Sequence, residues 1–165
     1  MHTNLLLALT LALSLASASW AGTKADTGFK KMKQEGSLVY YSGTTSLEGE
    51  FWYPISVSER EMIGDQICFN VAEQDAHKIP RDSDDTRSPW FCFKDTQTVV
   101  REFGLTEFAK LQVCELKGKA SIEVTNYVVD KAQTDTNDVA ELVKLVKKPE
   151  TVTVKLLAEG GESCE

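Results

Sequence analysis

The chain has 165 residues, a net charge of −7 at pH 7 and an apolar content of 42%. A chain of this length usually forms one domain with a real core, and this apolar content argues against intrinsic disorder. The acidic balance argues against binding to nucleic acid or to anionic membrane surfaces, because both require basic residues that neutralise phosphates.

The chain begins with an apolar segment over residues 5–15. This segment is shorter than the roughly 20 apolar residues that a transmembrane helix needs. Small residues follow it, and Ser19 and Ala21 have the spacing that a signal peptidase recognises. We predict a signal peptide over residues 1–21 that is cleaved after Ala21, which makes the mature protein periplasmic or secreted, without stable membrane insertion. A buried core helix and a retained membrane anchor are the alternatives.

The sequence predicts one domain between two polar ends. Residues 22–36 are polar and rich in lysine, and we expect an N-terminal arm that is loose or forms a short helix. The domain then spans residues 37–158, and residues 159–165 form a polar tail. We find no internal repeat and no second domain boundary.

Hydrophobic periodicity within the domain predicts mainly strands. In chain order, strands are expected near residues 38–53, 63–71, 90–93, 120–129, 139–146 and 152–156. A long polar loop is expected over residues 73–89. Apolar residues at helical spacing over residues 99–111 predict a helix that Asp95 or Thr96 can cap. Gly104 lies inside this segment and can split the helix into two short pieces.

This order of three strands, a helix and two strands resembles the OB-fold, a five-stranded Greek-key barrel whose helix lies between strands three and four. The resemblance covers Ser37 to Val146 and rests on the order of the elements. It implies a mainly β fold with one helix, arranged as a small OB-fold-like barrel with extra β segments at both ends. Another small α+β meander or a sandwich is the alternative.

The four cysteines, Cys68, Cys92, Cys114 and Cys164, all lie in the mature chain, and an even number in an exported protein favours disulfides. Cys68 and Cys92 occupy the centres of two successive predicted strands, at equal sequence distances from a reversal expected near Pro80. We therefore predict a Cys68–Cys92 disulfide across a hairpin, which leaves Cys114 to pair with Cys164. Two buried thiols together with a bridge to the C-terminal tail are the alternative.

No residue pattern predicts catalysis or metal binding. The mature chain has one histidine, His77, in a polar segment, and it has no Gly-x-Ser-x-Gly nucleophile elbow. The acidic stretch 82–85 lacks the glycine and the terminal glutamate of an EF-hand, and Arg81 and Arg87 can pair with its carboxylates. We predict no catalytic residues, no metal and no cofactor.

Aromatic and acidic residues near the expected second and third strands are candidates for partner binding, because ligands of OB-like barrels lie across these strands. The candidates are Trp52, Tyr53, Asp82, Asp84, Asp85 and Trp90. Exposed aromatic rings would anchor a partner and the carboxylates would attract it, which suits a basic protein of the cell envelope. Packing in the core is the alternative role of the aromatic rings.

These observations favour an exported, non-catalytic binding or interaction domain of the cell envelope. The alternative is an inhibitor or immunity protein against an envelope-acting lytic enzyme, since a small acidic protein with disulfides suits a basic target. An enzyme is the least favoured class.

The first prediction concerns processing. The exported protein should begin at Gly22, because Ser19 and Ala21 direct cleavage. Intact mass spectrometry of the exported protein tests this, and a mass that includes residues 5–15 would contradict it.

Overall fold

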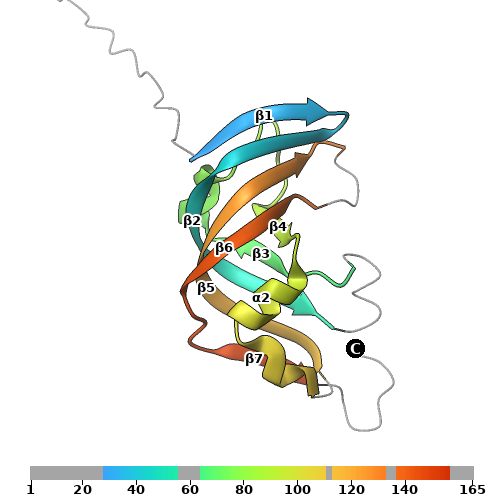
Figure 1. Cartoon of the computed structure of the whole chain (residues 1–165), viewed down its shortest axis with the longest axis vertical. Helices are drawn as coiled ribbons and strands as arrows, with labels where there is room; N and C mark the ends of the chain where they lie inside the picture. The colour runs from blue at the N-terminus through green and yellow to red at the C-terminus, as the bar shows by residue number, and fades with distance from the viewer. Residues whose placement is uncertain (1–27, 56–63, 111–112, 133–136, 157–165) are drawn as a thin grey trace, which may run out of the picture.

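The computed structural model describes residues 28–55, 64–110, 113–132 and 137–156, and these residues form a mainly β fold with one α-helix (Figure 1). The strands are β1 (Phe29–Glu35), β2 (Leu38–Pro54), β3 (Cys68–Val71), β4 (Trp90–Phe93), β5 (Val113–Asp130), β6 (Val139–Lys147) and β7 (Val152–Leu156). The helices are η1 (Glu73–Lys78), α2 (Thr96–Glu102) and η2 (Leu105–Lys110). The predicted mainly β fold with one helix is confirmed.

The seven strands form one sheet, and five of them pair in a closed cycle. β2 pairs with β3, β3 with β4, β5 with β6 and β5 with β2, all antiparallel, while β4 and β6 are parallel. β1 and β7 are added to the cycle as partners of β2 and β5. β2 is therefore shared: its first half pairs with β1, its second half pairs with β3, and β5 runs beside both halves. Figure 1 shows these two long strands curving through the height of the molecule.

A chain of aromatic rings fills the core. The ring of Phe91 lies 5.5 Å from that of Tyr127 and 5.4 Å from that of Phe93, measured between centroids. Phe103, which follows α2, lies 6.1 Å from Phe93 and 5.1 Å from Phe51 of β2. All five side chains are buried, and edge-to-face pairs of this kind contribute about 0.5–1.5 kcal/mol each beyond their buried area. The rings thus join three strands, β2, β4 and β5, and the helical segment into one core.

Two glycines make room for buried phenylalanine rings. A Cβ atom at Gly49 of β2 would lie 2.2 Å from the backbone oxygen of Asn70 and 2.6 Å from the ring of Phe69. A Cβ atom at Gly118 of β5 would lie 2.6 Å from the ring of Phe51. The inner faces of the two long strands are therefore flat at these positions because a phenylalanine ring occupies the space of the missing side chain.

The helical segment behaves as predicted. The Oδ1 atom of Asp95 accepts a hydrogen bond from the backbone N–H of Thr98 at 3.1 Å, so Asp95 is the N-cap of α2. Gly104 has a φ of 73° and separates α2 from η2. Few residues other than glycine adopt this backbone conformation readily, which explains why the chain bends there.

The N-terminal arm differs from the prediction. Residues 29–35, expected to be loose or helical, form the strand β1, which pairs with β2 through a turn at Gly36. The strand has the sequence FKKMKQE, and only Phe29 is buried. Because its residues do not alternate between apolar and polar, the sequence of this segment does not predict a strand. The ladder of hydrogen bonds offered by β2 overrides the local sequence preference. The loop expected over residues 73–89 also contains the short helix η1.

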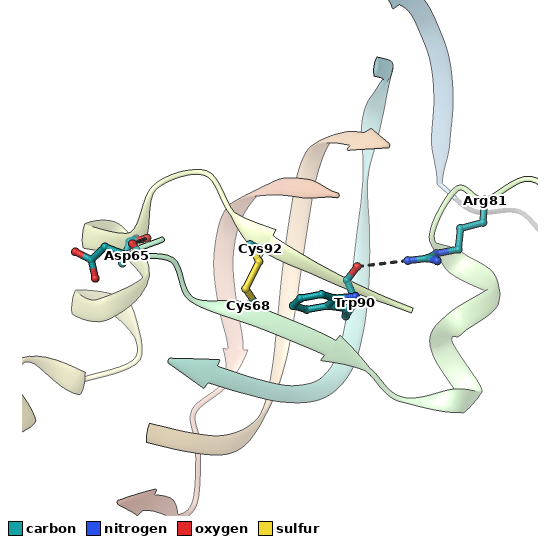
Figure 2. Close-up of a disulfide and its surroundings, with 6 residues drawn as sticks. Asp65, Cys68, Arg81, Trp90 and Cys92 are labelled. Atoms are coloured by element: carbon teal, nitrogen blue, oxygen red, sulfur yellow. Dashed lines mark hydrogen bonds between the residues drawn. A yellow bond between two sulfur atoms is a disulfide. The ribbon is translucent and has the colours of Figure 1, made fainter. Parts of the chain in front are cut away.

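The disulfide between Cys68 and Cys92 is confirmed, and it joins residues that face each other across β3 and β4. Figure 2 shows this bond with the indole ring of Trp90 beside it. Cys114 is also disulfide-bonded. Its predicted partner, Cys164, lies outside the described residues.

Packing at Gly49 generates the second prediction. Gly49→Ala should lower the free energy of unfolding by about 3 kcal/mol, because the new methyl group meets backbone and a buried ring that cannot move away. Urea denaturation measures this change. Gly36→Ala is the control: it has open space but a φ of 60°, so it should cost only about 1 kcal/mol. Equal losses in the two variants would contradict the packing argument.

Candidate binding groove

The structure distributes the predicted aromatic candidates over separate contacts. The indole Nε1–H of Trp52 donates a hydrogen bond to Glu115 at 3.0 Å. The ring of Tyr53 packs against the core, and its hydroxyl donates to Asp65 at 3.1 Å. Trp90 is half-buried beside the disulfide (Figure 2). All three side chains are therefore half-buried and partly accessible, and the ring of Tyr53 also packs against the core.

The predicted acidic residues also separate. Asp85 is 8% exposed and forms an ion pair with Arg87, with Nη2 and Oδ2 2.7 Å apart. Hydrogen bonds from Arg87 lower the pKa of Asp85 to about 2. Asp82 is exposed and pairs with Lys131, and Asp84 is exposed as well. The loop thus presents less free negative charge than its sequence suggests.

A buried carboxylate holds this loop on the sheet. The side chain of Asp138, just before β6, is fully buried and lies 3.3 Å from Arg87 and 3.5 Å from Arg81. It also accepts hydrogen bonds from the backbone N–H of Asp130 at 3.1 Å and from the hydroxyl of Tyr127 at 3.3 Å. Burial raises the pKa of Asp138, although both arginines act in the opposite direction. Arg81 and Arg87 therefore attach the long loop to the sheet through their ion pairs with Asp138.

Irregular strand pairing marks a different surface. Three register shifts fall at one level of the sheet: at Met32 in β1, after Tyr40 in β2 and before Val128 in β5. Asn126, inside the shifted part of β5, has a φ of 49° and is the one residue other than glycine with positive φ in the described chain. Bulges and strained backbone of this kind occur preferentially at functional sites. This level of the sheet is therefore a candidate for a binding site.

A groove of about 940 Å³ opens at this level, across β1, β2, β5 and β6. Its apolar lining comes from Met32, Leu38, Tyr40, Val128 and Val139. Its polar lining includes Gln66, Lys94, Asn126, Asn137 and Glu141. A largely apolar concavity with a few polar groups on one side is the usual form of a small-molecule site.

The apolar lining follows one row across the strands. Tyr40 of β2 faces Val128 of β5, and Val128 faces Val139 of β6. On the other side of Tyr40 lies Lys33 of β1, whose Nζ is 4.6 Å from the centroid of the tyrosine ring. The exposed side chain of Met32 lies next to this end of the row. The row thus forms an apolar path that crosses the strands from β2 over β5 to β6.

The polar side of the groove is an exposed network around Glu141. Asn126 Nδ2 donates to Glu141 at 2.8 Å, and the Nζ of Lys94 lies 2.9 Å from the other carboxylate oxygen. These two partners lower the pKa of Glu141. The Lys94 side chain is 69% exposed. Exposed ion pairs of this kind contribute about 0–1 kcal/mol, so Lys94 can exchange its partner at little cost.

A second groove, of about 740 Å³, crosses β2, β3 and β5 and is lined mainly by polar residues, among them Glu48 and Glu50. It has no aromatic or large aliphatic side chain in its lining.

In the described ranges, no group of three or more His, Cys, Asp or Glu residues is placed to hold a metal ion. Among the helices described here, none combines the length and the apolarity needed to cross a bilayer.

Sequence reasoning missed the groove because its lining comes from several separate segments and depends on register shifts. Met32 lies between two lysines in a polar segment, so its position in the sequence does not indicate a role in binding. Asn126 was the one available signal, since asparagine is depleted in strands and here it interrupts a run rich in β-branched residues. Such a residue can mark a bulge, but it does not show what the bulge faces.

Comparisons with known proteins found no match: no family model, no curated protein and no solved structure matches the chain. Inference about function therefore depends on the geometry of the groove.

The loop contacts generate the third prediction, on acid stability. Asp85→Asn should lower the free energy of unfolding by about 2 kcal/mol at pH 7, because the pKa of Asp85 falls from 3.8 to about 2 on folding. A carboxyl group with a lowered pKa stabilises the fold above its unfolded pKa and loses this effect as the pH falls. The difference between variant and wild type should therefore disappear between pH 4 and pH 2.

Urea denaturation at several pH values measures this dependence. Asp84→Asn, an exposed neighbour in the same loop, is the matched control and should change stability by less than about 0.5 kcal/mol. A loss for Asp85→Asn that stays constant down to pH 2 would show that the ion pair is not its cause.

Proposed function

We propose that this chain is an exported, non-catalytic binding domain of the cell envelope, built on an OB-fold-like barrel, and that the groove over β1, β2, β5 and β6 holds its ligand. The observation that carries the proposal is the apolar row of Tyr40, Val128 and Val139 on the outside of the sheet. A monomeric domain rarely leaves such a concave apolar path accessible unless something binds there.

The pairing of the strands supports the barrel. The strands β2, β3, β4, β6 and β5 pair in this order, and β5 pairs with β2 to close the cycle. In the sequence, α2 lies between β4 and β5, the third and the fourth of these five strands. This is the order of elements in an OB-fold, with β1 and β7 as additions. Full closure of this kind leaves the cycle without free edges.

The oxidised cysteines support export. The Cys68–Cys92 bond and the disulfide-bonded state of Cys114 suit an oxidising compartment such as the periplasm or the extracellular space. The predicted signal peptide, residues 1–21, lies outside the described residues.

The polar groups of the groove support binding more than catalysis. The lowered pKa of Glu141 keeps this carboxylate ionised near neutral pH, so it accepts hydrogen bonds and does not donate a proton. Its partners, Lys94 and Asn126, hold it in place. The amide and ammonium groups around it can orient a ligand without changing it.

The alternative function, an inhibitor or immunity protein against an envelope-acting lytic enzyme, relies on the acidic loop. Asp85 is neutralised by Arg87 inside the chain, and Asp82 pairs with Lys131. The loop therefore supports a basic protein partner less strongly than the groove supports a small ligand.

The fourth prediction tests the groove as a binding site. Native mass spectrometry of the protein isolated gently from the exported fraction should show a non-covalent adduct. Val128→Glu should remove the adduct because it places a charge in the apolar row. Val143→Glu is the matched control: Val143 is 48% exposed on β6 and does not line the groove, so the adduct should persist.

Melting temperatures of both variants establish that they are folded. An adduct that persists in folded Val128→Glu would place the binding site elsewhere. Absence of any adduct from the wild-type protein would count against the proposed function.

A further inference from the structure

We propose that the ligand of this groove is a single-chain amphiphile with an anionic headgroup, whose acyl chain lies along the row of Tyr40, Val128 and Val139. The inference rests on the proposed function and specifies its ligand. Three observations carry it: the direction of the apolar row, the pairing of the backbone beneath it and the position of the two lysines at its ends.

The length of the row suits an alkyl chain. Neighbouring strands lie about 4.8 Å apart, so a path from β1 across β2 and β5 to β6 covers about 14 Å. This length is comparable with that of an extended dodecanoyl chain. Met32 at one end has a flexible, unbranched side chain that can adapt to chains of different length.

The backbone beneath the row disfavours an extended peptide. A peptide that adds to a sheet needs a free strand edge, where its own N–H and C=O groups find partners. Here Tyr40 and Val128 lie on strands that have neighbours on both sides, so the row presents side chains to a ligand and no free edge. An alkyl chain needs no hydrogen bonds and can cross the strands.

Lysines occupy both ends of the row, which suits an anionic headgroup. Lys33 lies over the ring of Tyr40 and pairs with Glu35 at 2.7 Å, whereas Lys94 pairs with Glu141 at 2.9 Å. All four side chains are at least one-third exposed, so both pairs are weak and can open.

The polar groups decide between the two ends. Three side-chain amides, those of Gln66, Asn126 and Asn137, line the groove together with Lys94. They offer both donors and acceptors to a headgroup. At the other end, Lys33 has the tyrosine ring as its neighbour. We therefore place the headgroup at Lys94 and the end of the acyl chain near Met32.

The fifth prediction compares three amphiphiles with the same alkyl chain. Protein freed of co-purified ligand should bind dodecanoate, measured by isothermal titration calorimetry below the critical micelle concentration. Dodecyltrimethylammonium, with the opposite charge, should bind about tenfold more weakly, because a charge-assisted hydrogen bond is lost. Dodecyl maltoside measures the contribution of the chain alone.

Variants locate the headgroup and the chain. Lys94→Gln should weaken dodecanoate binding about tenfold and leave dodecyl maltoside unchanged. Lys33→Gln, the matched change at the other end of the row, should have less than a twofold effect. Val128→Glu should abolish binding of all three compounds, and Val143→Glu should bind like wild type.

Each outcome decides one part. Equal affinity for the three amphiphiles, or equal losses in the two lysine variants, would overturn the headgroup assignment. If no amphiphile binds while the exported protein still carries an adduct that Val128→Glu removes, the ligand is of another class, such as a peptide, and the proposed function stands. If neither the adduct nor amphiphile binding is found, both proposals fail.

Discussion

The short parallel pairing of β4 with β6 is the link on which the rest of the fold depends, because it closes the cycle of five strands. Only two residue pairs form this link, Cys92 with Val139 and Phe93 with Ala140. A backbone hydrogen bond from the N–H of Cys92 to the carbonyl of Asp138 at 2.8 Å extends it. The disulfide to Cys68 holds β4 from its other side. The short pairing of β4 with β6 is thus reinforced by a backbone hydrogen bond and by a disulfide.

The groove depends on the same link. Val139, the last residue of the apolar row, pairs with Cys92 in β4, so the row reaches its full length only when the cycle is closed. The buried carboxylate of Asp138 lies next to Val139 in sequence and binds the two arginines of the long loop. The position of the groove floor is therefore set by the disulfide and by the Asp138 contacts together.

Much of the fold could be predicted from local patterns. Alternation of apolar residues identified the strands β2 to β7, although β3 begins only at Cys68 and β5 begins as early as Val113. Asp95 and Gly104 delimited α2, and the symmetry of Cys68 and Cys92 about Pro80 gave their register. β1 could not be predicted, because its stability comes from pairing with β2 and its sequence is almost entirely polar.

The site was harder to predict than the fold. The sequence placed Arg81 and Arg87 beside the acidic stretch, so an ion pair was expected, but it did not show that Asp85 would be buried. Nor did it show that Tyr53 would pack on the core. Burial is a property of distant segments brought together, and a list of residue types does not contain it. The groove was harder still to predict, because it arises from three register shifts in the pairing of separate strands, and no single segment encodes them.

The division of β2 into two halves has a consequence for how this surface could change over time. Its second half pairs with β3 and β5 in the closed cycle, while its first half pairs with β5 and also forms a hairpin with β1, a strand outside that cycle. Substitutions at the six exposed positions of β1 can reshape one end of the groove without touching the aromatic core, which β1 reaches through the buried ring of Phe29. Under the proposed function, specificity and stability would therefore be encoded in largely separate residues at that end, which leaves the hairpin free to diversify while the cycle is kept.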